Sequence, residues 1–437
     1  MKAVLALTVT AVLWAGAANV PRAPEPADYL EVDPAEAELG QLLFYDRILS
    51  GNRNIACSTC HHPRFGTSDG VSLSLGEGGV GLGPERTPDP DDMPEQRIPR
   101  NAQALFNLGA REFTVMFNDG RVEADATHKS GMRTPLEDDM LVGFDGVLSA
   151  QAMFPVTSPD EMAGHYGEND VAKAVRTGRI TGEGGAWDII AKRVADIDAY
   201  RERFEAVYPH IRDGAQINFT DVSNALAAFI AFEWRSDDSR FDRFLKGKEE
   251  FSAEELEGMA LFYGRADCAS CHSGKFQTDH GFHAMGVPQL GPGKAARFES
   301  HTRDTGRQRV TGAETDMFSF RTPSLRNVTA TAPYGHTGAY RDLRAFVAAH
   351  LSPDTAISTY DRHQAVLPKL EVEDWTVLED DSEMAAIVAA ADKRHVALND
   401  GEVAALVAFL GTLTDETALS GRLGVPQSVP SGLPVDR

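Results

Sequence analysis

Apolar residues spaced three and four positions apart predict helices along much of the chain. Residues 200–208 and 221–234 show this spacing clearly. Alternation of apolar and polar residues, which is typical of strands, is scarce. Segments 76–99 and 178–185 are rich in glycine and other turn-forming residues, which favours long loops. The pattern therefore predicts a mainly α fold with long loops and little β structure.

One hydrophobic phrase occurs twice in the chain. Residues 40–45 read G-Q-L-L-F-Y and residues 258–263 read G-M-A-L-F-Y. Each phrase ends a predicted helix, because Asp33 and Ser252 are suitable N-caps and each is followed by a glutamate three residues later. Each helix then leads into a C-x-x-C-H string. The repeat predicts two related modules.

Length and composition favour two domains, since 437 residues are more than one hydrophobic core usually serves. Polar residues cluster at 236–239, so we expect an N-terminal domain over 19–235 and a C-terminal domain over 236–437. The Pro- and Gly-rich tail after residue 420 has no periodicity and can pack back on the first domain.

The N-terminus has the features of a secretory signal peptide. Over residues 1–18, Lys2 precedes an apolar run too short to span a bilayer, and small residues follow at 15–17. A buried N-terminal helix is the alternative. No later segment approaches about 18 uninterrupted apolar residues, so we expect no membrane span and a periplasmic mature protein.

Charge narrows the range of partners. The 65 acidic side chains outnumber the 42 basic ones, which gives a formal net charge of -23. Nucleic acid would be repelled by this excess, whereas cationic partners would be attracted.

All four cysteines lie in the two C-x-x-C-H strings. Cys57 and Cys60 precede His61, and Cys268 and Cys271 precede His272. This spacing lets two thiols on one turn bond the two vinyl groups of a haem and places the histidine beneath the iron. The competing interpretations are a zinc site, a redox-active cysteine pair and disulfides. With 13 His in 437 residues, a His after both pairs by chance has a probability of ~0.001, which favours two covalent c-type haems.

A second iron ligand is indicated for the C-terminal haem. Asp342 can cap a helix on which His350 continues an apolar stripe. A core histidine bonded to a backbone carbonyl is the alternative, and other side chains compete for the ligand role. The competitors are His283, Met285, His301 and His336.

The chain resembles the bacterial dihaem cytochrome c peroxidases and the related dihaem enzyme that matures methylamine dehydrogenase. The resemblance runs from about residue 33 to residue 351 and rests on the two haem strings and five further phrases. These are P-R-N at 99–101, F-N-D-G-R at 117–121, residues 151–162 ending in P-D-E-M, T-P-S-L-R-N-V at 322–328, and T-A-P-Y-G-H-T-G at 331–338. It implies two cytochrome c-like haem domains.

The resemblance also implies roles for individual residues. The N-terminal haem would be the peroxidatic site, with Glu161 and Gln151 over its open face. The C-terminal haem would take up electrons, and its sixth ligand falls at His350 by register from 333–334. A calcium ion between the domains would be bound by the Asn101 side chain and the carbonyls of Thr331 and Pro333.

Two positions depart from the family pattern. Glu77 stands where many members have a histidine that blocks the peroxidatic iron, which suggests an iron that needs no reductive activation. Asn118 stands where members usually have a tryptophan between the haems. The usual route by which an electron or hole passes between the haems is therefore in doubt.

These inferences predict a periplasmic peroxidase that reduces hydrogen peroxide with electrons from a small c-type cytochrome or cupredoxin. One alternative is an oxidase that acts on a partner protein or a small organic molecule through high-valent iron. Another is a non-enzymatic dihaem cytochrome, which requires both irons to be six-coordinate. A homodimer is left open.

Overall fold

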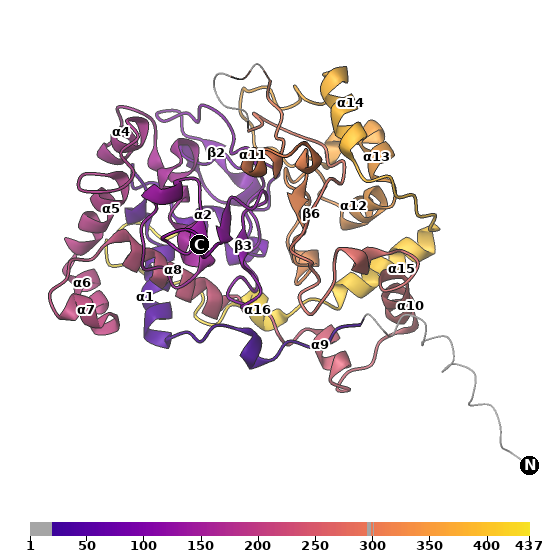
Figure 1. Ribbon diagram of the computed structural model, residues 1–437, viewed down its shortest axis with the longest axis horizontal. Helices are drawn as coiled ribbons and strands as arrows, with labels where there is room; N and C mark the ends of the chain where they lie inside the picture. The colour runs from indigo at the N-terminus through magenta and orange to yellow at the C-terminus, as the bar shows by residue number, and fades with distance from the viewer. Residues whose placement is uncertain (1–19, 295–298, 300) are drawn as a thin grey trace, which may run out of the picture.

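The computed structural model describes residues 20–294, 299 and 301–437 (Figure 1). The expected signal peptide over 1–18 lies outside these residues. The described chain is mostly helical with a few short strands, as the sequence pattern predicts.

Two helix pairs organise the molecule. Helix α1 (Pro34–Phe44) packs on α8 (Phe219–Glu233), and α10 (Ala253–Phe262) packs on α15 (Asp400–Gly411). The first pair belongs to the left half of Figure 1 and the second to the right half. The repeated hydrophobic phrase therefore marks one helix of each pair.

The glycine of each repeated phrase lies at a helix crossing. A Cβ atom on Gly40 would overlap the carbonyl oxygen of Ala225, and one on Gly258 would overlap that of Ala405. Glycine thus allows the two backbones to approach closely in both pairs.

An aromatic cluster flanks each crossing. The rings of Phe44 and Phe229 are 5.2 Å apart in the first half, and those of Phe262 and Phe409 are 5.2 Å apart in the second. Each cluster belongs to a separate hydrophobic core, so each half has its own packed interior.

The remaining helices surround these pairs. Those of the first half are α2 (Cys57–Cys60), α3 (Val147–Ala152), α4 (Asp170–Arg176), α5 (Ala186–Ala195), α6 (Asp198–Val207) and α7 (Pro209–Arg212). Those of the second half are α9 (Arg240–Leu245), α11 (Gln308–Thr311), α12 (Leu343–His350), α13 (Pro353–Ala356) and α14 (Asp381–Ala390).

Single helical turns connect many of these elements. The 3-10 turns are Pro26–Asp28, Arg47–Leu49, Pro63–Phe65, Gly83–Glu85, Glu137–Asp139, Pro155–Thr157, Cys268–Ser270, Glu314–Asp316, Val328–Ala330, Ile357–Thr359 and Arg362–Gln364. One π-helical turn spans Pro159–Ala163.

The strands form three small antiparallel sheets. Strand β1 (Gly79–Val80) pairs with β2 (Thr87–Pro88), and β6 (Phe282–His283) pairs with β7 (Phe320–Arg321). Strand β4 (Val122–Ala124) lies between β3 (Val115–Met116) and β5 (Met132–Arg133). Segment 76–99, where a long loop is expected, contains the short hairpin of β1 and β2.

Most of the expected helix starts are confirmed. Asp33 caps α1, and Ser252 forms a capping box with Glu255 at the start of α10. Asp342 caps α12. Glu36 is the exception, because its carboxylate accepts a hydrogen bond from Tyr208 at 2.6 Å instead of closing a capping box.

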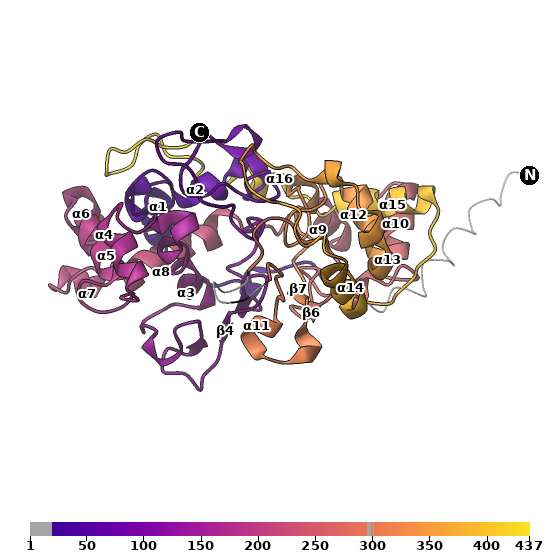
Figure 2. The same ribbon diagram turned by 90° about the horizontal axis from the view of Figure 1, so that it is seen from above.

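The C-terminal tail returns to the first half. After α16 (Glu416–Ser420), the yellow segment in Figures 1 and 2 runs back toward α2. The carboxylate of Glu233 in α8 accepts hydrogen bonds from the backbone N–H groups of Arg422, Leu423 and Gly424. Val429 is buried in the first core.

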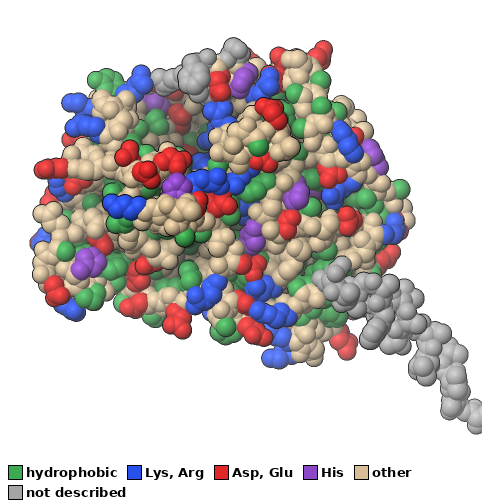
Figure 3. Space-filling model, viewed as in Figure 1, with side chains coloured by type: hydrophobic (Ala, Val, Ile, Leu, Met, Phe, Trp, Pro, Cys, Tyr) green, Lys and Arg blue, Asp and Glu red, His purple; other side chains and the backbone are tan. Residues whose placement is uncertain are grey.

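The surface is mixed in charge on the face shown in Figure 3, where acidic and basic side chains are intermingled. Within the described residues, no helix is both long enough and apolar enough to cross a bilayer.

Candidate functional site

Two cavities lie beside the two C-x-x-C-H strings. The N-terminal cavity, of about 200 Å³, is lined by Cys57, Cys60 and His61 among other residues. The C-terminal cavity, of about 280 Å³, is lined by Cys268, Cys271 and His272 among others. The fold therefore places the thiols and imidazole of each string at the wall of its own cavity.

The histidine of each string has the same orientation. The Nδ1 atom of His61 lies 3.0 Å from the carbonyl oxygen of Thr67, and that of His272 lies 3.1 Å from that of Gln277. A carbonyl oxygen can only accept, so each Nδ1 carries the proton and each Nε2 has a free lone pair. This is the tautomer that a metal-ligating histidine requires.

The thiols do not behave as a redox pair. Burial raises the pKa of Cys57 and that of Cys268 to about 12, and it also raises the pKa of Cys60. Reactive C-x-x-C sites instead depress the pKa of a thiol. Neither string forms a disulfide. Half-buried, unpaired cysteines at a cavity wall fit thioether attachment better than the competing interpretations.

Helix α12 turns its apolar stripe toward the C-terminal cavity. The lining from this helix and its end is Leu343, Phe346, Val347, His350 and Leu351. The Nδ1 atom of His350 donates to the carbonyl oxygen of Phe346 at 2.9 Å, so its Nε2 is free. Burial lowers the pKa of His272 to about 4, and repulsion from His350 adds to this, which indicates that the two imidazoles lie near each other.

The competing ligands differ in their surroundings. His283, Met285 and His336 also line the C-terminal cavity, whereas His301 does not. The Nε2 atom of His283 is bonded to Asp279 at 2.9 Å. The ring of His336 stacks on Phe320 at 3.6 Å, and its buried Nε2 atom has no partner among the described residues.

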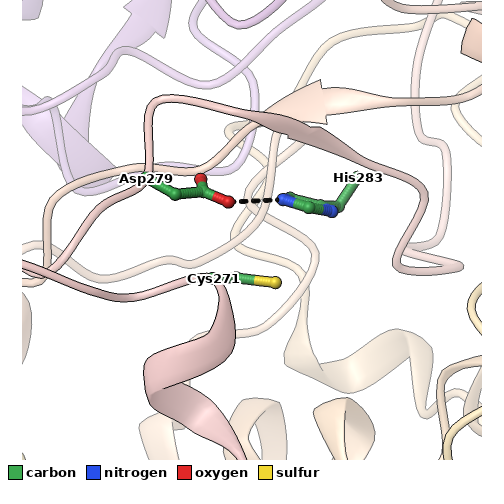
Figure 4. Close-up of side chains that lie close together, drawn as sticks. All are labelled: Cys271, Asp279 and His283. Carbon is green, nitrogen blue, oxygen red and sulfur yellow. Dashed lines mark hydrogen bonds and ion pairs between the residues drawn. The ribbon is translucent and has the colours of Figure 1, made fainter. Parts of the chain in front are cut away.

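Figure 4 shows Cys271, Asp279 and His283, whose ligand atoms lie within 4.8 Å of one another. The dashed line marks the bond between Asp279 and His283. Cys271 belongs to the C-x-x-C-H string, so a thioether bond would occupy its sulfur. We therefore assign no separate metal site to this group.

The N-terminal cavity carries an acid and an amide. Gln151, from α3, and Glu161, from the π-helical turn, both line it. Burial raises the pKa of Glu161, while the nearby cations Lys294 and Arg121 oppose that rise. The Oε1 atom of Gln151 is buried without a hydrogen-bond partner among the described residues. Both side chains are thus placed to contact a small ligand.

Lys294 also lines the N-terminal cavity, although the second half of the chain supplies it. Burial lowers its pKa to about 8, and repulsion from Arg121 and Arg100 contributes. Sequence reasoning missed this residue. It follows the turn-rich string G-P-G at 291–293, which has no periodicity that would indicate a contact with the other half.

The three residues expected to bind calcium line the same cavity. Asn101, Thr331 and Pro333 all line the C-terminal cavity. The Nδ2 group of Asn101 donates to the carbonyl oxygen of Val71 at 2.8 Å, which leaves its Oδ1 for another partner. Within the described residues, no hydrogen bond reaches the carbonyl oxygens of Thr331 and Pro333. Amide and carbonyl oxygens of this kind are ligands that calcium accepts.

The two departures from the family pattern have clear positions. Asn118 lines both cavities and accepts a hydrogen bond from Gln103. Glu77 is 1% exposed and accepts hydrogen bonds from Asn52 and Asn54, both at 2.7 Å. Glu77 is absent from the lining of the N-terminal cavity.

Comparison with known proteins agrees with this geometry. The family model described as di-haem cytochrome c peroxidase matches residues 34–250. The methylamine utilization protein MauG of Paracoccus denitrificans is 29% identical over 417 residues, which cover 91% of this chain and 92% of that protein. The cytochrome c551 peroxidase of Nitrosomonas europaea is 28% identical, with 74% and 73% covered.

Solved structures share the fold. A MauG-like protein associated with microbial copper homeostasis has a TM-score of 0.58 at 24% identity, covering 92% of this chain and 95% of its own. The diheme peroxidase BthA from Burkholderia thailandensis has a TM-score of 0.56 at 21% identity, with 96% and 94% covered.

Two cavities with C-x-x-C-H strings, together with these matches, define an oxidoreductase of the peroxidase class. The chain belongs to the di-haem cytochrome c peroxidase family. Membership in this family implies two c-type haems.

Proposed function

We propose that the protein is a periplasmic peroxidase that reduces hydrogen peroxide to water with electrons from a small redox protein. The supporting observation is a difference between the two cavities. The C-terminal cavity has His350 in addition to His272, whereas among the described residues the N-terminal cavity has one imidazole, that of His61. An iron with both axial positions filled transfers electrons, and one with a free position can bind a small ligand.

The chain provides attachment for one haem in each proposed domain, 19–235 and 236–437. Cys57, Cys60 and His61 would hold the first, and Cys268, Cys271 and His272 the second. When bound, the haems supply the redox chemistry of iron, which no side chain here can replace. The free Nε2 atoms and the raised pKa values of the Cys57 and Cys268 thiols fit this role.

Glu161 and Gln151 would act on the peroxide itself. Reduction consumes two protons and two electrons and yields two waters, so a proton must reach the oxygen that leaves. A Glu161 carboxylate can take a proton from one peroxide oxygen and return it to the other. The amide of Gln151 can accept a hydrogen bond from the peroxide at Oε1, which has no other partner among the described residues, and so orient it.

His350 would complete the ligation of the C-terminal haem and make it the site of electron entry. Its Nδ1 bond to Phe346 fixes the ring. Calcium held by Asn101, Thr331 and Pro333 would join residues from both proposed domains and so stabilise their relative orientation.

One observation favours a second candidate. The match to the methylamine utilization protein MauG spans 91% of the chain, more than the match to the cytochrome c551 peroxidase does. An oxidase of a partner protein or a small organic molecule is therefore the alternative to a peroxidase.

Rapid mixing of the fully oxidised protein with hydrogen peroxide tests the proposal. Because Glu77 does not line the N-terminal cavity, we expect a spectral change without prior reduction. A small basic c-type cytochrome should then be oxidised, two molecules per peroxide. If peroxide reacts but the donor is not oxidised, the alternative is favoured. If no reaction occurs until reductant is added, another residue blocks the iron.

A further inference from the structure

Arg321 lies between the two cavities. It ends strand β7, it is 6% exposed, and it lines both the N-terminal and the C-terminal cavity. Asn118 lines both cavities as well, and its carbonyl oxygen accepts the backbone N–H of Arg321 at 2.7 Å. The strand therefore fixes the Arg321 backbone at the partition between the two candidate haem sites.

The guanidinium of Arg321 has few partners. Its Nε donates to the carbonyl oxygen of Phe117 at 3.2 Å. Its Nη1 is buried and has no hydrogen-bond partner among the described residues. Within the residues that the structure describes, no carboxylate forms an ion pair with Arg321.

Four of the five other buried arginines in the described residues are paired with carboxylates, and the fifth, Arg86, donates to the carbonyl oxygens of Gly76 and Gly79. Arg97 pairs with Asp374, and Arg326 pairs with Asp242. Arg100 bonds both Asp119 and Asp304. A buried charge without a counterion is strongly unfavourable, so the isolation of Arg321 calls for an anion supplied from outside the chain.

Desolvation lowers the pKa of Arg321 to about 10, so the guanidinium stays charged at neutral pH. An arginine fork matches a carboxylate in geometry and binds it through two N–H groups. Each haem carries two propionate carboxylates. The cofactor can thus supply the missing anion on either side of the partition.

We propose that Arg321 binds a propionate of the haem in each cavity and so links the two haems through one cation. This inference rests on the proposed function, because it requires a haem in both cavities. Ferric iron carries one positive charge more than ferrous iron, so a nearby cation favours the ferrous state of each haem. Arg321 would then raise both reduction potentials and lower the pKa values of the propionates it binds.

Spectroelectrochemical titration of Arg321→Met tests the proposal. We expect both midpoint potentials to fall. A tenfold fall in the ferrous-to-ferric ratio of each haem at fixed applied potential corresponds to about 59 mV for a one-electron couple. Without the cation the propionate pKa values rise, so the inflection in each plot of potential against pH should move to higher pH. A purely structural role of Arg321 would not move that inflection.

Arg394→Met is the matched control. Arg394 is paired with Asp392 at 3.0 Å. It lines the C-terminal cavity but not the N-terminal one, so Arg394→Met should change the potential of the C-terminal haem alone. If Arg321→Met leaves either potential unchanged, the shared link is overturned. Arg321→Lys is the second variant. It keeps the charge but loses the fork, so both potentials should lie between those of the wild type and Arg321→Met.

Haem content separates this inference from the proposed function. A wild-type protein with fewer than two covalent haems per chain in a pyridine haemochrome assay would contradict the proposed function. Two attached haems whose potentials do not respond to Arg321→Met or Arg321→Lys would overturn only the inference.

Discussion

Thr59 donates a hydrogen bond to the Oδ2 atom of Asp436 at 2.6 Å, although 377 positions separate them in the sequence. Thr59 lies between Cys57 and Cys60, so this bond connects the C-terminal tail to the first attachment string. Asp436 also forms an ion pair with Arg47 at 2.5 Å. The tail therefore supports the segment that would hold the N-terminal haem.

Asp436→Asn should reduce the free energy of unfolding of the protein. Its carboxylate is 8% exposed and makes two charge-assisted contacts, whose loss we expect to cost about 1–3 kcal/mol. Denaturant unfolding followed by the absorbance of the N-terminal haem measures this. Asp400→Asn is the control, because that carboxylate is fully exposed and its loss should change the free energy of unfolding much less. Equal effects of the two variants would argue against a supporting role for the tail.

His350→Ala should convert the C-terminal haem to high spin while both haems remain attached. The change follows because the variant removes the imidazole placed near His272. Low-temperature electron paramagnetic resonance of the oxidised protein measures the spin state. His336→Ala is the informative control, since His336 has a free Nε2 atom in the same cavity. If His336→Ala gives the high-spin signal and His350→Ala does not, the ligand assignment is wrong.

The sequence predicts those features that repeat or are local. The recurring phrase with Gly40 and Gly258 indicates two modules, and the structure explains it by two equivalent helix crossings. The cap at Asp342 and the spacing after it predict both α12 and the face that carries His350. In these cases the information lies within a few turns of helix.

Contacts between distant segments could not be predicted in this way. Lys294 follows a turn-rich string, and nothing local indicates that it lines the cavity of the other half. Asp436 lies in a tail without periodicity, yet it contacts the first attachment string. The lack of a carboxylate partner for Arg321 among the described residues likewise depends on the tertiary structure, which decides the side chains that surround it.

Glu161→Gln should slow the reaction of the oxidised protein with peroxide. An amide cannot accept the proton, and loss of a general acid–base typically costs about 10²–10⁴-fold in rate. Stopped-flow mixing measures the rate, and the resting spectrum should change little. Glu77→Gln is the control, because Glu77 is buried outside the cavity lining. A similar loss of rate in both variants would show that the effect is not specific to the cavity.

Lys294→Met should change the pH dependence of that same reaction. In the folded protein burial raises the pKa of Glu161, and the positive charge of Lys294 opposes this rise. Without that charge the pKa of Glu161 rises further, so a higher pH is needed to form the carboxylate that accepts the proton. The rising limb of the rate profile should therefore move to higher pH, while the rate at its plateau should fall much less than in Glu161→Gln.

Lys294→Arg retains the charge and should keep the limb near its wild-type position. Lys192→Met, at an exposed site paired with Asp188, controls for loss of a lysine elsewhere. An unshifted limb in Lys294→Met would mean that this lysine does not influence the proton acceptor.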